Sequence, residues 1–251
     1  MDPDVRDRER FVEYFRKRAE GTGQRGVADA RSQLWSPLAL QFADMGRDLF
    51  AAGTVSEVLQ LIADFAAAVV PGASSASVTT RDAVGGLSTL AHTDRLCAEL
   101  DLLQHRLGEG PALRAADDGG TGLGYSADLT ADQAWPRFGP QAADRGVRSA
   151  LAAGVVLAAE GRKAVVTLWS SEPRGLAAAD PDVALVLASY SAIAIDAAGA
   201  RNDARVREPL RSSDVMIRAA DTLIGNRGLP PEDAYDVLWR AARGLVEAWR
   251  G

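Results

Sequence analysis

Five arginines near the end of the chain form the first group whose spacing could support binding chemistry: Arg211, Arg218, Arg227, Arg240 and Arg243. On a helix, Arg211 and Arg218 would share a face because they are two turns apart, and Arg240 and Arg243 would be neighbours. A guanidinium group pairs bidentately with phosphate oxygens or a guanine edge, and it stacks on unpaired bases. These arginines are therefore candidate contacts for phosphates and unpaired bases, the chemistry that RNA recognition uses.

The charge balance supplies a competing interpretation of the same residues. Residues 205–251 contain eight arginines and seven acidic residues, which leaves a net charge of only +1. The whole chain has 251 residues and a net charge of −6, so nucleic-acid binding would need a local basic patch. A solvated helix surface of alternating charge explains the arginines as well as an RNA interface does.

A second group of candidates could line a ligand pocket in the middle of the chain: His92, Leu107, Trp135, Phe138 and Trp169. Buried aromatic residues more often belong to a core than to a ligand cage, so both interpretations stay open. The two histidines and the single cysteine, Cys97, are too scattered for a metal site, and we expect neither a metal nor a cofactor. A lone cysteine also excludes an intrachain disulfide and fits a reducing compartment.

Motifs typical of catalysis are missing from the sequence. There is no P-loop, GxSxG, HExxH or paired CxxC pattern. The glycine-rich run at 119–124 precedes a predicted strand instead of joining a strand to a helix, which argues against a phosphate cradle. We expect no enzymatic activity.

The elements that must position these residues follow from hydrophobic patterns. Strands are predicted at 76–80 and 87–91, joined by a hairpin turn at Gly85-Gly86, at 125–128, and in a long hairpin formed by 150–159 and 163–170. Helical periodicity covers 38–49, 55–69 with a cap at Thr54 or Ser56, 95–104 and 135–146. Further helices are predicted from the start signal Asp180-Pro181-Asp182 past 198, over 210–224, and from Pro230. This order indicates an α+β fold, an antiparallel sheet flanked by helices, followed by a small all-helical module.

The middle of the chain resembles the GAF domains of actinobacterial regulators. The segment 103–113 reads LQHRLGEGPAL and is similar to the "Q…GEGPC" turn of that group, with Ala112 where the family often has cysteine. Matches continue at Asp128-Leu129, at 135–138 and at 146–149. The resemblance implies a sensory domain over residues 37–200, preceded by a leader at 1–36 that is helical or partly disordered.

Residues 201–251 resemble the ANTAR module, a three-helix RNA-binding domain of transcription antiterminators. The resemblance is carried by Leu210–Met216, Ala219, Leu223, Gly228-Leu229, Ala234-Tyr235, Leu238 and Arg240. Ala220 and Asp221 stand where the family shows lysine and glycine, which removes one attraction to phosphate and adds a repulsion. Only 244–251 remain for a third helix, about two turns, so we expect that helix to be truncated.

Together the two resemblances imply a signal-responsive transcription antitermination regulator. The GAF-like domain would sense an unknown small ligand or a partner in signal transduction, and the ANTAR-like helices would bind RNA hairpins. The alternative is a GAF-based dimer that acts through protein contacts, with a degenerate ANTAR tail that does not bind RNA. The alanine-rich helices at about 37–50 and 180–204 could pack on their own sheet, form a parallel bundle in a homodimer, or do both along different faces. A charged N-terminus and the absence of an 18-residue apolar run predict a cytoplasmic protein without a membrane segment.

Overall fold

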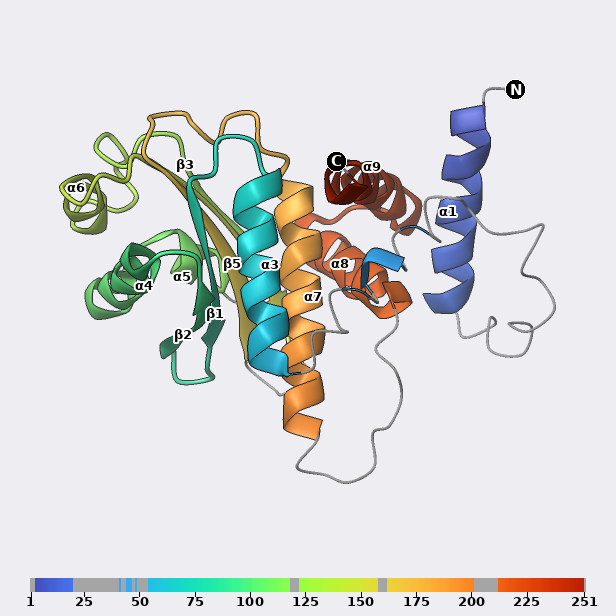
Figure 1. Ribbon diagram of the computed structural model, residues 1–251, viewed down its shortest axis with the longest axis horizontal. Helices are drawn as coiled ribbons and strands as arrows, with labels where there is room; N and C mark the ends of the chain where they lie inside the picture. The colour runs from blue at the N-terminus through green and yellow to red at the C-terminus, as the bar shows by residue number, and fades with distance from the viewer. Residues whose placement is uncertain are drawn as a thin grey trace.

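A five-stranded antiparallel sheet lies at the centre of the computed structural model (Figure 1), which describes residues 3–19, 41, 44–46, 48, 54–117, 122–157, 162–200 and 212–250. The strands are β1 (Ser75–Arg81), β2 (Leu87–His92), β3 (Leu123–Ser126), β4 (Ser149–Val156) and β5 (Lys163–Ser170). Their order across the sheet is β2-β1-β5-β4-β3. The predicted α+β class and antiparallel sheet are confirmed.

The two predicted hairpins pair with each other through β1 and β5. Gly85, with φ 89, makes the turn between β1 and β2, a conformation that favours glycine. The β4–β5 ladder runs from Ser149 opposite Ser170 to Val156 opposite Lys163. β3 lies earlier than the predicted 125–128, because Gly124 belongs to the strand and glycine weakens the strand pattern in the sequence.

Helices cover both faces of the sheet. α3 (Val55–Val69) and α7 (Pro181–Ala200) lie on one face, whereas α4 (Arg95–Leu107), α5 (Pro111–Ala115) and α6 (Phe138–Ala143) lie on the other (Figure 1). Thr54 caps α3 in a reciprocal capping box with Glu57, as one of the two predicted caps. α4 runs further than predicted, α6 is shorter, and α5 was not predicted.

Three more helices lie beyond α7: α8 (Ser212–Arg227), α9 (Pro231–Arg250) and α1 (Pro3–Ala19). α8 and α9 pack on α7, and α1 packs on α8 and α9 (Figure 1). α9 continues through Gly244, so the residues predicted to begin a third helix extend the second one. The predicted leader contains α1, and within the predicted helix at 38–49 the described positions 41, 44–46 and 48 are helical; the rest of both segments lies outside the described residues.

α7 joins the two halves of the structure. Its side chains from Ala184 to Ile195 are buried, and the helix contacts β4, β5, α3, α8 and α9. One continuous apolar core therefore includes the sheet residues Val166 and Leu168 together with Met216 of α8 and Leu238 of α9. A homodimer would need a surface other than this buried part of α7.

Candidate functional site

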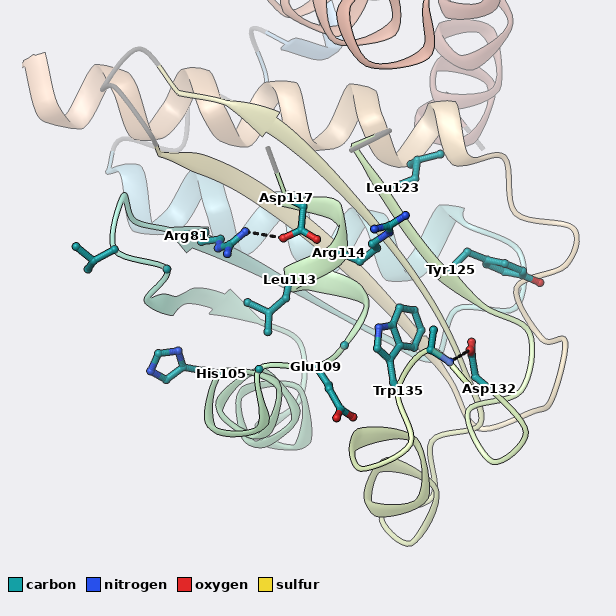
Figure 2. Close-up of a pocket in the computed structure, with 15 residues that line it drawn as sticks. Arg81, His105, Glu109, Leu113, Arg114, Asp117, Leu123, Tyr125, Asp132 and Trp135 are labelled. Atoms are coloured by element: carbon teal, nitrogen blue, oxygen red, sulfur yellow. Dashed lines mark hydrogen bonds and ion pairs between the residues drawn. The ribbon is translucent and has the colours of Figure 1, made fainter. Parts of the chain in front are cut away.

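A cleft of about 890 Å³ opens beside α4 and α5, on the sheet face opposite α7 (Figure 2). That volume lies in the range of small-molecule sites in proteins. The turn between α4 and α5 forms one wall with Gly108, Glu109 and Gly110, and the end of β1 contributes Arg81. Apolar surface comes from Leu113, Leu123, Tyr125 and Trp135.

The turn that forms this wall is fixed by backbone geometry and by Gln104. Gly108 ends α4 with φ 66, and Gly110 has φ 139, both in the region that favours glycine. The buried Gln104 Oε1 accepts a hydrogen bond of 2.8 Å from the Ala112 amide at the start of α5. A β-carbon on Gly110 would lie 2.4 Å from that same oxygen, so the GEGP pattern is required by packing as well as by the turn.

Glu109 ties the turn to the start of α6. Its carboxylate accepts hydrogen bonds from the amides of Arg137 and Phe138 at 2.9 and 3.1 Å, and from Arg137 Nε at 2.6 Å. Burial opposes ionisation, but these hydrogen bonds hold the pKa of Glu109 below its usual value. Arg137 thus balances the charge of Glu109 in the wall of the cleft.

α5 sits directly on strand backbone because two strand positions have no side chain. A β-carbon at Gly124 would lie 2.1 Å from the Pro111 carbonyl oxygen, and one at Gly154 would lie 2.4 Å from the Ala115 carbonyl oxygen. The glycines bring the short helix close to β3 and β4, which places Leu113 and Arg114 at the cleft.

A polar interior lies between α4 and the sheet. The buried Asp101 accepts hydrogen bonds from Thr89 Oγ1 at 3.0 Å and from Gln104 Nε2 at 3.3 Å. Burial raises the pKa of Asp101 to about 7, although the Ser77 and Thr89 hydroxyls oppose the rise. Since Gln104 also holds the Ala112 amide, Asp101 supports the cleft wall through one intermediate side chain.

The predicted pocket residues are distributed between the cleft, the core and the surface. Trp135 lines the cleft, and Leu107 packs against the core beside α4 while its carbonyl accepts a hydrogen bond from Arg137. Phe138 and Trp169 lie in that core with ring centroids 6.2 Å apart. His92 is exposed at the end of β2 and does not line the cleft.

Among the charged residues of the cleft, sequence reasoning missed Arg81, Arg114 and Asp117 as site residues. They end a strand or lie in or beside a helix of five residues, where no periodic pattern marks them. A signal was available for Arg81, because an arginine that ends an apolar strand shortly before a glycine turn lies where the strand leaves the sheet.

The predicted RNA-binding arginines divide into two pairs. Arg218 and Arg227 of α8 face α7, where Arg218 lies 2.7 Å from Asp196 and Arg227 lies 2.6 Å from Asp182. Burial raises the pKa of Asp182, and Arg227 opposes the rise. Arg240 of α9 also lies close enough to Asp182 to oppose that rise, so Arg227 and Arg240 approach the same carboxylate. Arg211 lies outside the described residues.

Arg240 and Arg243 lie on the exposed side of α9. Arg243 stacks over Trp239 at 5.5 Å from the ring centroid and forms a 3.0 Å pair with Glu247. Asp236, one turn before Arg240, pairs with Arg8 of α1. Acidic residues are therefore interspersed with the arginines of this surface.

The described residues contain neither an assembled metal site nor a cysteine in a setting that favours its thiolate. No three His, Cys, Asp or Glu side chains gather closely enough there to hold a metal ion. Cys97 is buried, and that burial raises the pKa of its thiol, which disfavours the reactive thiolate.

Comparisons with known proteins leave the resemblances as proposals. A scan against protein-family models gives no match, and a search of curated proteins finds none similar in sequence. None of the helices in the described part of the chain combines the length and apolar character that crossing a bilayer requires.

Proposed function

We propose that this chain is a signal-responsive regulator of the GAF–ANTAR type, in which the cleft binds a small ligand and the C-terminal helices act as the output. The observation that carries the proposal is the packing of α8 and α9 on α7, the helix that also backs β4 and β5. A ligand that favours one arrangement of the sheet and α7 would change the placement of α8 and α9. Such a response requires different ligand affinities for the two arrangements.

The proposed output is RNA hairpin binding in transcription antitermination, in the cytoplasm. Arg240 and Arg243 are exposed on α9 and supply the guanidinium groups for phosphates and loop bases. Arg218 and Arg227 join them only when their pairs with α7 open. The order of strands and the turn at 108–111 are compatible with a GAF-like fold, which supports the sensory half of the proposal.

The test is a salt-titrated binding assay with RNA hairpins that expose loop bases. We expect hairpins to bind more tightly than scrambled RNA at 150 mM salt, where the screening length is about 8 Å. The double variant R240A R243A should weaken binding and reduce the salt slope by about one unit for each arginine–phosphate pair that it removes. The matched control is Arg95→Ala, an exposed arginine on α4. Equal binding of hairpins and scrambled RNA contradicts the proposal.

The second candidate is a protein-interaction module whose tail does not bind RNA. The pairs Arg218–Asp196 and Arg227–Asp182 favour it, because they use predicted RNA-binding residues to hold helices together. This candidate predicts no preference for hairpins and a stable homodimer, which sedimentation velocity measures directly. A monomer that binds hairpins excludes it.

A further inference from the structure

Cationic side chains gather where the C-terminal end of α5 meets the cleft. Arg81 Nη1 donates hydrogen bonds to the Ala116 carbonyl at 3.1 Å and to Asp117 Oδ1 at 2.9 Å. Lys163 Nζ donates to the Asp117 carbonyl at 2.8 Å. Arg114 lies three residues before Asp117 on the same segment, and in Figure 2 it lies on the side of Asp117 away from Arg81.

Both arginines of the cleft keep hydrogen-bond donors for a ligand. Arg81 uses Nη1 alone, so within the described part of the chain its Nε and Nη2 have no partner. Arg114 is exposed, and its guanidinium has no hydrogen bond or ion pair to any described residue. A guanidinium fork with free donors matches the paired oxygens of a carboxylate or a phosphate.

The acidic residues that line the cleft are already engaged. Asp117 pairs with Arg81, and Glu109 pairs with Arg137. Asp132 accepts a 3.0 Å hydrogen bond from the Ala134 amide and lies beyond Trp135 in Figure 2. Among the described residues no cation pairs with Asp132, so the cleft has two unmatched charges: Arg114 beside α5 and Asp132 beyond Trp135.

Apolar surface adjoins Arg114. Leu113 precedes Arg114 on α5 and lines the cleft, and so does Trp135, whose ring is largely buried. Cleft walls of this kind bury the flat apolar body of a ligand while a few polar groups fix its orientation.

We propose that the cleft binds a small aromatic anion, with its carboxylate or phosphate on Arg114 and its ring against Leu113 and Trp135. The assignment rests on the proposed ligand-sensing function and names the chemical class of the signal. Arg114 provides charge selectivity, and Trp135 provides affinity for the ring.

Two matched pairs of probes test the assignment by calorimetry on the full chain. 1-Naphthyl phosphate is compared with 1-naphthol, and 1-naphthoate with 1-naphthamide. We expect at least one anionic probe to bind about tenfold more tightly than its neutral partner, which is about 1.4 kcal/mol. The preferred anion distinguishes a phosphate from a carboxylate ligand. Raising the salt concentration should narrow the difference.

Variants locate the effect. Arg114→Leu should abolish the preference for the anion and leave the neutral probes unchanged, whereas Trp135→Leu should weaken all four probes. Arg95→Leu, at an exposed arginine outside the cleft, is the control. Because Arg114 is exposed, its variant is expected to keep the wild-type melting temperature.

The outcomes separate this inference from the function on which it rests. Equal binding of charged and neutral probes, sensitive to Trp135→Leu, overturns the anion assignment and leaves ligand sensing intact. Failure of all four probes to bind at millimolar concentration overturns the aromatic-anion assignment. The RNA assay decides the output function independently of these measurements.

Discussion

Arg227 Nη1 lies 2.6 Å from Asp182 Oδ1 and joins the last turn of α8 to the first turn of α7. About four helical turns further along α7, Asp196 holds Arg218 at 2.7 Å. Both arginines belong to the group that the sequence predicts for RNA. Docking on α7 and the proposed contact with RNA phosphate would therefore draw on the same guanidinium groups.

The first prediction concerns the strength of the Arg227–Asp182 pair. Both side chains are largely buried, at 21% and 16% exposure, so removal of one partner leaves a poorly solvated charge. Arg227→Met should lower the free energy of unfolding by about 1–3 kcal/mol. A double-mutant cycle with Asp182→Asn measures the coupling by urea denaturation. If the losses of stability of the two single variants add up to that of the double variant, the coupling free energy of the pair is zero.

The second prediction follows from the shared use of the arginines and rests on the proposed RNA binding. Replacing both Asp182 and Asp196 by asparagine removes the charges that hold α8, so hydrogen exchange of α8 amides should accelerate. Affinity for RNA hairpins should rise, because Arg218 and Arg227 become available. Asp144→Asn, at an exposed position after α6, is the control. Faster exchange without a gain in affinity would remove these two arginines from the RNA interface.

The third prediction concerns pH and Asp101. Its folded-state pKa of about 7 exceeds the ordinary aspartate value of 3.8, so the folded protein holds this proton more tightly than the unfolded chain does. The resulting stabilisation is complete below about pH 4 and is lost as the pH rises through about 7. Asp101→Asn should remove this loss, which is on the order of 4 kcal/mol.

Urea denaturation of wild type and Asp101→Asn between about pH 4.5 and pH 8 measures the effect. The difference between the two curves should grow in favour of the variant up to about pH 7 and then level off. Thr89→Val removes a hydrogen bond to the Asp101 carboxylate. This change should raise the pKa of Asp101 further and move the pH at which the difference levels off to a higher value. Parallel curves for wild type and Asp101→Asn would contradict the prediction.

The fourth prediction compares two glycines. At Gly124 a β-carbon would meet the Pro111 carbonyl at 2.1 Å, whereas at Gly244 nothing lies within 4 Å. Gly124→Ala should lower stability by about 1–3 kcal/mol because α5 must move. Gly244→Ala should raise stability by about 0.5–1 kcal/mol because alanine favours the helix. Thermal unfolding checks both; a tolerated Gly124→Ala would mean that α5 adjusts freely.

Local patterns in the sequence predict most of the sheet and the helix starts. The glycines at 85–86 mark the first hairpin, and Thr54 and Asp180 mark helix N-termini that the structure contains. The sequence pattern does not predict α5, because five residues contain less than two helical turns. Its proline is also typical of a turn. Nothing in the local sequence pattern indicates that α5 packs against Gly124 and Gly154.

The candidate sites depend on contacts between distant residues, which spacing along the chain does not contain. Arg137 reaches Glu109 across 28 residues, and Arg81 reaches Asp117 across 36. The helical spacing of the arginines identifies which of them share a face of the helix. It does not show whether that face is turned toward solvent or toward the rest of the protein. For Arg218, Val215 and Thr222 share its side of α8 and are both buried, so this side turns toward the protein.

The buried course of α7 makes the sheet and the C-terminal helices one thermodynamic unit. Side chains of α7 complete the core on the sheet side and, at the same time, the core beneath α8 and α9. Neither half can lose its packing without exposing apolar surface of the other, so calorimetry should record a single cooperative transition whose van't Hoff and calorimetric enthalpies agree. Although 201–211 separates the two parts in sequence, their folding free energy is shared.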